Sequence, residues 1–478
     1  MPRIVLRAPS VFEAGFSRIR AELDVPMAFP HTVLTEAEAA HDMVPAGERR
    51  DARDLPLVAI DPPGATDLDQ AVHIERIESG DAAYRVWYAI ADVGAFVTPG
   101  GAIDTEARAR GATMYSPDGR APLHPAVVSE DRASLLAGTT KPCVLWSIEL
   151  DDRGDAVSWH LERATVQVRE AISYATAQAR IDAAGGNDAE PLSLLAEVGR
   201  LRQDREADRG GISINLPAQE IVEHNGSYTV EFDTSLPVEG WNAQISLLTG
   251  MVASHVMVDA GVGVLRTLPP PYSDAIDRLR ITATALDLDW PAEEPYSSFV
   301  RRLTPNSAAC NAFLLQSTRT LRGAGYIGFD GSVPEHRSHG AIASTYAHVT
   351  APLRRLVDRF GNEIVLAALA DRRPPTWALE ALDELPSLMG RSRQRESALE
   401  RALVDLSEAI VLEHSVGEVF AGYVVDVDRR REQAKIQIPN PAVVAPVPAE
   451  GRSLAEQVSL RLTEVSVEDR KVHFDVVS

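Results

Sequence analysis

The sequence predicts an α+β protein in which a mixed sheet with helices is followed by a small all-β barrel. Alternating apolar and polar residues between Leu55 and Val93 are typical of paired strands. From about residue 165 to 410, apolar residues at helical spacing dominate, and short strand-like segments return after His414. With 478 residues the chain can form two or three domains of roughly 150 residues each.

Composition and charge exclude several functional classes. The chain is 45% hydrophobic and 24% charged, as in ordinary soluble proteins, and we expect no membrane association. Cys143 and Cys310 are its two cysteines and neither lies in a Cys-x-x-Cys pair, so a reducing, cytoplasmic location is predicted. A net charge of −22 argues against a general polyanion binder but allows a local basic channel.

The region 1–50 is expected to form two short helices, around 10–24 and 34–41, and its role is open. The stretch 47–54, "GERRDARD", has the composition of an exposed linker. The segments "LPLVAI" (55–60), "AVHIERI" (71–77) and "YRVWYAIADV" (84–93) then read as strands.

An acidic loop, "AIDPPGATDLDQAV" (59–72), joins the first two of these strands and holds Asp61, Asp67 and Asp69. Crowded carboxylates are stabilised by divalent cations, and Mg²⁺ favours a few carboxylates with a substrate phosphate. Two such ions about 4 Å apart can serve an in-line phosphoryl displacement. The alternative is a solvated acidic turn, and the spacing alone favours a metal site only slightly.

A second polar cluster begins a predicted helix in "YAHVTAPLRRLVDRFGNEIVLAALA", where Thr350 and Pro352 are start signals. Arg354 and Arg355 then fall in the first helical turn, where free N–H groups and a guanidinium fork favour a phosphate. For Arg354, a salt bridge at the helix end is an equally good reading. His348 has no partner at zinc-ligand spacing and is interpreted as structural or RNA-contacting.

Another helix, "SRQRESALERALVDLSEAIVLEH", carries an apolar stripe that leaves Glu400 off the buried face. Residues 413–478 follow, with "GEVFAGYVVDVD" and "QAKIQI" as one hairpin around a basic turn and "VSLRLTEVSVEDRKVHFDVV" as a second. So many strands in so short a stretch predict a small closed barrel, most often an OB fold.

Four motifs occur in one order: "IDPPGATDLDQAV", "YRVWYAIADVGAFV", "ATMYSPDGRAPLHP" and "YAHVTAPLRRLVD". Together they resemble the RNase II/RNase R family, whose catalytic module is the RNB domain. The resemblance implies an RNB-like exoribonuclease domain over 51–412 and an OB-fold barrel over 413–478. Residues 1–50 do not resemble the cold-shock domains that usually precede this module.

The resemblance implies a processive, Mg²⁺-dependent 3′→5′ exoribonuclease, with Mn²⁺ as another possible metal. Its substrate would be single-stranded RNA with a free 3′ end, and its products nucleoside 5′-monophosphates. Asp61, Asp67 and Asp69 match the acidic metal positions, Asp69 also being catalytic, and Arg354 matches an arginine that grips the phosphate. The expected RNA-binding residues are Tyr115, Tyr174, Gln244, Glu400, Arg355 and His348.

Three residues depart from the family pattern. Gln70 stands where a fourth aspartate is usual, although its carbonyl oxygen could still be a metal ligand. Gln244 replaces a glutamate that meets the sugar hydroxyls, and Asn215 replaces a base-stacking aromatic. The alternative function is therefore a catalytically weak RNA-binding protein that kept the fold.

Overall fold

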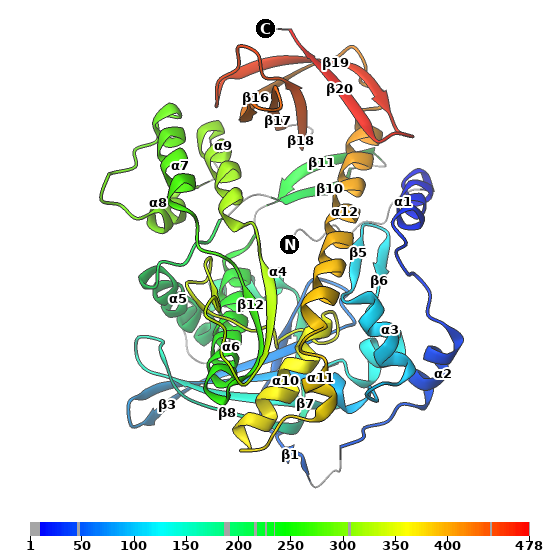
Figure 1. Ribbon diagram of the computed structural model, residues 1–478, viewed down its shortest axis with the longest axis vertical. Helices are drawn as coiled ribbons and strands as arrows, with labels where there is room; N and C mark the ends of the chain where they lie inside the picture. Colours follow the sequence, from blue (N-terminus) through cyan, green and yellow to red (C-terminus); the bar gives the residue numbers. More distant parts are fainter. Residues whose placement is uncertain are drawn as a thin grey trace.

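A computed structural model describes residues 10–44, 48–185, 192–214, 218–224, 227–233, 235–304, 307–439 and 442–477 (Figure 1). Within these residues the largest sheet has seven strands in the order β1–β8–β7–β4–β3–β2–β9. Its pairs are antiparallel except β1 with β8 and β2 with β9. The strands are β1 (Arg50–Asp51), β2 (Val58–Ile60), β3 (Gln70–Ser79), β4 (Ala82–Ala91), β7 (Thr140–Leu150), β8 (Ala156–Gln167) and β9 (Glu170–Ile172).

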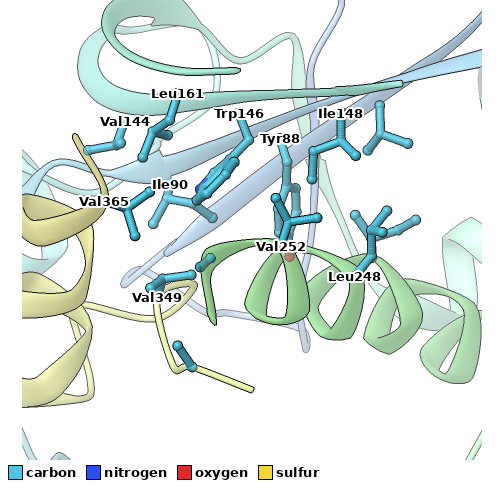
Figure 2. Close-up of a cluster of buried hydrophobic side chains, with 14 of the residues drawn as sticks. Tyr88, Ile90, Val144, Trp146, Ile148, Leu161, Leu248, Val252, Val349 and Val365 are labelled. Carbon is cyan, nitrogen blue, oxygen red and sulfur yellow. The ribbon is translucent and has the colours of Figure 1, made fainter. Parts of the chain in front are cut away.

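Both faces of this sheet are buried, because alternate residues of β4 enter two different cores. Tyr88 and Ile90 belong to the larger core, whereas Trp87 and Ala89 belong to the core on the opposite face. Figure 2 shows the larger core, in which Tyr88, Ile90 and Trp146 of the sheet face Leu248 and Val252 of α6 (Pro237–Ala260) and Val365 of α10 (Leu356–Leu369). The central strands are thus fixed from both sides, which fixes the loops at their ends.

In the view of Figure 1 this sheet lies at the lower end of the molecule, and most of the remaining elements lie above it. The other helices are α1 (Ser10–Glu22), α2 (His31–Ala39), α3 (Ala102–Arg110), α4 (Tyr174–Ala184), α5 (Ser193–Asp208), α7 (Ser273–Ala285), α8 (Tyr296–Arg302), α9 (Ala308–Ser317), α11 (Thr376–Glu380) and α12 (Leu385–Leu412), with short η2 (Val93–Ala95), η3 (Val127–Arg132) and η4 (Thr318–Leu321). Four strand pairs stand apart: β5 (Met114–Ser116) with β6 (Gly119–Ala121), β10 (Ala218–His224) with β11 (Ser227–Asp233), β12 (Val262–Thr267) with β13 (Gly325–Asp330), and β14 (Ser338–His339) with β15 (Ser344–Thr345).

The two predicted N-terminal helices are present as α1 and α2, and both contribute to buried apolar clusters. Phe12 and Phe16 of α1 form a core with Leu399, Leu403 and Leu406 of the long helix α12. The prediction of an exposed linker at 47–54 is wrong in part. Arg50 and Asp51 join the sheet as β1, because the outer edge of β8 offers free backbone partners. In addition, a buried ion pair of 3.0 Å joins Arg49 to Asp92.

The predicted C-terminal barrel is confirmed. Its described strands, β16 (Val419–Asp428), β17 (Gln433–Pro439), β18 (Ala442–Pro448), β19 (Gln457–Ser466) and β20 (Lys471–Val476), form one sheet in the order β18–β17–β16–β19–β20. This sheet curls into a nearly closed barrel around its own apolar core, which Leu412 at the end of α12 also enters. In the described part of the chain, each helix is too short or too polar to cross a bilayer.

Candidate active site

The acidic loop runs from the end of β2 to the start of β3, two neighbouring strands. The amide of Asp61 donates to the carbonyl of Ile172 in β9 at 3.1 Å, which fixes one end of the loop. Near the other end, the amide of Leu68 donates to Ser134 Oγ at 2.9 Å. Gly64, with φ of +79°, makes the turn between them. The loop is therefore fixed at both ends against the sheet and its surroundings.

Asp69 lies at the centre of the site and its side chain is buried. The backbone amide of Leu353 donates to its Oδ1 at 2.8 Å, and Arg354 Nε lies 3.3 Å from its Oδ2. Burial raises the pKa of the Asp69 carboxyl to about 8, against the opposing effects of Arg354 and the Leu353 amide. The fold thus brings together Asp69 and Arg354, which lie 285 residues apart in the sequence.

Arg354 and Arg355 have different surroundings. Both precede α10, which begins at Leu356, so their predicted place in the first helical turn is wrong. Asp358 caps this turn instead, accepting from the Ala351 amide and from Arg355 Nε and Nη2 at 2.7 Å each. Arg355 thereby makes a two-bond ion pair with Asp358. Arg354, by contrast, stays partly exposed beside Asp69.

Asp67 has an ion-pair partner that the sequence did not indicate. Arg120 of β6 binds its Oδ1 through Nη1, and also lies 2.9 Å from Glu130. Tyr115 of β5 approaches the other oxygen of Asp67, with its hydroxyl at 3.5 Å. Both residues come from the motif "ATMYSPDGRAPLHP", so the strand pair β5–β6 closes one side of the site.

Gln70 is held at both ends of its amide. Its Nε2 donates to the carbonyl of Thr350 at 2.6 Å, and its Oε1 accepts from the Tyr88 hydroxyl at 2.6 Å. Ser246 Oγ lies 2.7 Å from the same hydroxyl. A role as metal ligand would require the Gln70 carbonyl to share or leave the Tyr88 bond.

Two of the expected RNA contacts lie in other surroundings. Gln244 is buried on α6 and donates to Glu206 at 2.5 Å. His348 lies 2.7 Å from the Tyr326 hydroxyl, and burial, followed by the charge of Arg355, holds the pKa of His348 well below its usual value. Its imidazole is therefore neutral.

The remaining expected contacts are distributed over the module. Tyr174 begins α4 immediately after β9, close to the strand that fixes Asp61, and Glu400 is exposed on α12. Asn215 lies outside the described residues.

The donor atoms suit a divalent cation in kind, because Asp61, Asp67 and Asp69 offer hard oxygens. The raised pKa of Asp69 shows that Arg354 alone does not compensate a charge on this carboxyl, whereas a nearby cation would. Within the described residues, however, no three His, Cys, Asp or Glu side chains are already grouped as a metal site. Asp67 uses Oδ1 for Arg120, so Oδ2, 3.5 Å from the Tyr115 hydroxyl, is the atom that it can offer to a cation.

Comparison with known proteins identifies the family to which this chain belongs. Residues 49–371 match the RNB domain, and residues 418–477 match the RNase II-type exonuclease C-terminal S1 domain. The chain belongs to the RNB family. Within that family it is 27% identical over 456 residues to the exosome complex exonuclease dis3 of Schizosaccharomyces pombe, covering 87% of this chain and 44% of that protein. This RNB chain thus spans less than half the length of that relative.

Two solved structures share the fold. Mycoplasma genitalium RNase R in complex with ribose methylated single-stranded RNA superposes with a TM-score of 0.86 at 17% identity, covering 98% of this RNB chain and 78% of that one. Yeast Ssd1, a pseudonuclease, has a TM-score of 0.72 at 15% identity, covering 96% of this chain and 59% of its own. The RNB fold therefore occurs both in a protein named as a ribonuclease and in one named as a pseudonuclease.

Proposed function

We propose that this RNB protein is a Mg²⁺-dependent 3′→5′ exoribonuclease that hydrolyses single-stranded RNA processively to nucleoside 5′-monophosphates in the cytoplasm. The observation that carries the proposal is the contact of Arg354 with Asp69, on the loop that also holds Asp61 and Asp67. A phosphate-binding guanidinium is thereby next to three oxygen donors, the combination that phosphodiester hydrolysis needs.

Each group has a defined task in this proposal. Arg354 grips the scissile phosphate with its planar fork, and its partly exposed side chain allows this. Asp61, Asp67 and Asp69 hold the metal, which when bound supplies charge neutralisation and an activated water. Tyr115, beside Asp67, and Tyr174, beside β9, stack on the last bases. Mn²⁺ has the same ligand preferences and could replace Mg²⁺.

The relatives support the substrate. The S. pombe relative is named as an exonuclease, and the M. genitalium RNase R structure holds single-stranded RNA. The C-terminal S1 domain is of the OB type, whose strands bind single strands by stacking and backbone contacts.

A second candidate function is RNA binding without hydrolysis. It is favoured by Gln70, whose amide is used in bonds to Thr350 and Tyr88, and by the fold likeness to a pseudonuclease. Such a protein would hold the 3′ end of an RNA and leave it intact.

The two functions separate in one assay. End-labelled single-stranded RNA is incubated with the protein in Mg²⁺, in Mn²⁺ and in chelator, and products are resolved by size and charge. Release of 5′-monophosphates that requires metal supports the exoribonuclease. Retention of bound, uncut RNA under all three conditions supports the second function.

A further inference from the structure

A groove of about 640 Å³ lies at the junction of the catalytic module and the barrel, away from the acidic loop. Its walls come from α7, η4 and the turn between β16 and β17. Figure 1 shows α7 and α9 beside these barrel strands. Seven of its eleven lining residues are arginine or lysine, so we call it the arginine groove; the run Arg429–Arg431 forms its barrel side.

The two acidic residues of the arginine groove are already engaged in holding its walls. Asp426 binds Arg319 of η4 at 2.7 and 2.9 Å and accepts from Gln316 of α9 at 2.7 Å. Asp428 accepts from the backbone amides of Arg430 and Arg431, at 3.0 and 3.2 Å, which shapes the turn. These carboxylates hold the groove together, and their two negative charges leave its seven cations in excess.

Several of the cations have no such partner. Arg322, Arg429 and Arg430 are exposed and make no ion pair with any described carboxylate, and Arg431 reaches Asp428 only at 3.9 Å. Like charges gathered in a concave site raise the local positive potential. The chain as a whole has a net charge of −22, so this cluster of positive charge is opposite in sign to the rest of the protein. The site therefore favours an anionic ligand with several charges.

We propose that the arginine groove binds backbone phosphates of RNA, on the part of the strand upstream of the 3′ end. A row of guanidinium forks suits successive phosphates. Val427 is its one apolar lining residue, whereas protein interfaces have apolar centres. The assignment rests on the proposed function in assuming that RNA is the ligand, but it concerns a site outside the active centre.

The test uses the full chain, in chelator so that no RNA is cut. Binding is measured for a short oligonucleotide and for an RNA about 16 nucleotides longer, the upper site size of one OB fold. The variant R429A/R430A/R431A removes the barrel side of the groove. The control R153A/R372A/R373A removes the same charge from exposed arginines outside the groove. Thermal unfolding of each variant is measured to check that its fold is intact.

For the long RNA, the groove variant should bind several-fold more weakly. The slope of log affinity against log salt concentration should be less steep by about 2 for this variant, because three phosphate contacts that contribute about 0.7 each are lost. The short RNA and the control variant should be unaffected.

Equal salt slopes for native and groove variant, with the native protein binding both RNAs, would overturn this inference alone. An equal loss on the short RNA would overturn it as well, because the turn would then act through the active centre. Absence of RNA binding by the native protein would overturn both proposals.

Discussion

Gln70 and Thr350 are joined by a 2.6 Å hydrogen bond from the amide nitrogen of the first to the backbone carbonyl of the second, across 280 residues of sequence. This bond ties the first residue of β3 to the segment that carries Arg354. A glutamine can make it while accepting from Tyr88, whereas a carboxylate has no proton to donate to a carbonyl. The departure from the family pattern thus has a structural use in this chain.

We predict that Gln70→Asp destabilises the protein, and that Gln70→Glu, which keeps the side-chain length, does so too. An unpaired Thr350 carbonyl facing a carboxylate should cost about 1–3 kcal/mol. Urea unfolding of both variants and the native protein measures the loss. Unchanged stability together with a lower Mg²⁺ requirement for cleavage would instead identify position 70 as a metal ligand.

Asp69→Asn should nearly abolish hydrolysis while RNA binding in chelator persists. Asparagine keeps an oxygen for the Leu353 amide but lacks the negative charge that a metal needs. Single-turnover cleavage of labelled RNA is the measurement. Asp81→Asn, in the exposed turn between β3 and β4, is the matched control and should cleave normally. Native-rate cleavage by Asp69→Asn would mean that the reaction occurs elsewhere.

The neighbouring arginines allow a paired comparison. Arg354→Lys should lower turnover by about 10²–10³, because an ammonium group cannot bind two phosphate oxygens in one plane. Arg355→Lys should instead lower the free energy of unfolding, since it breaks the two-bond contact with Asp358. Cleavage rates and urea midpoints of both variants are compared. If the two lose turnover equally, Arg354 has no special contact with the phosphate.

With a chelator present, the contribution of Asp69 to the free energy of unfolding should fall as pH rises from about 4 toward 8. The pKa of this carboxyl is raised from 3.8 to about 8 in the folded protein, so the folded state holds a proton that the unfolded state has lost. The difference in unfolding free energy between the native protein and Asp69→Asn should show this trend, because asparagine does not titrate. Parallel pH curves for the two proteins would contradict it.

The sequence predicted those features that depend on residues close together in the chain. The strand alternation placed β3 and β4, and the acidic loop and Arg354 came from motifs that the fold brings together. The partner of Asp67 was missed because Arg120 lies 53 residues away and no local periodicity links them. The ion pair of Arg355 with Asp358 is different, since a spacing of three residues was visible in the sequence.

Tertiary packing and the position of a strand at the edge of its sheet account for the other differences between the predictions and the structure. The contacts of Gln244 with Glu206 and of His348 with Tyr326 arise only when separate helices and strands pack together. Strand β18 was not predicted because Pro446 and Pro448 interrupt a strand pattern. It is the first strand in the order of the barrel sheet, and strand edges tolerate residues without an N–H.

The packing of α1 constrains the order of events during synthesis. Glu22 at the end of α1 binds Arg470 in the turn before β20, 448 residues away, and Arg18 donates to the Glu468 carbonyl. At roughly 5–20 residues per second, a nascent chain needs on the order of 20–90 s to supply these partners. The polar contacts of α1 with the C-terminal turn can therefore form only after the last strands emerge, whereas its aromatic face packs on α12 and is covered earlier in synthesis.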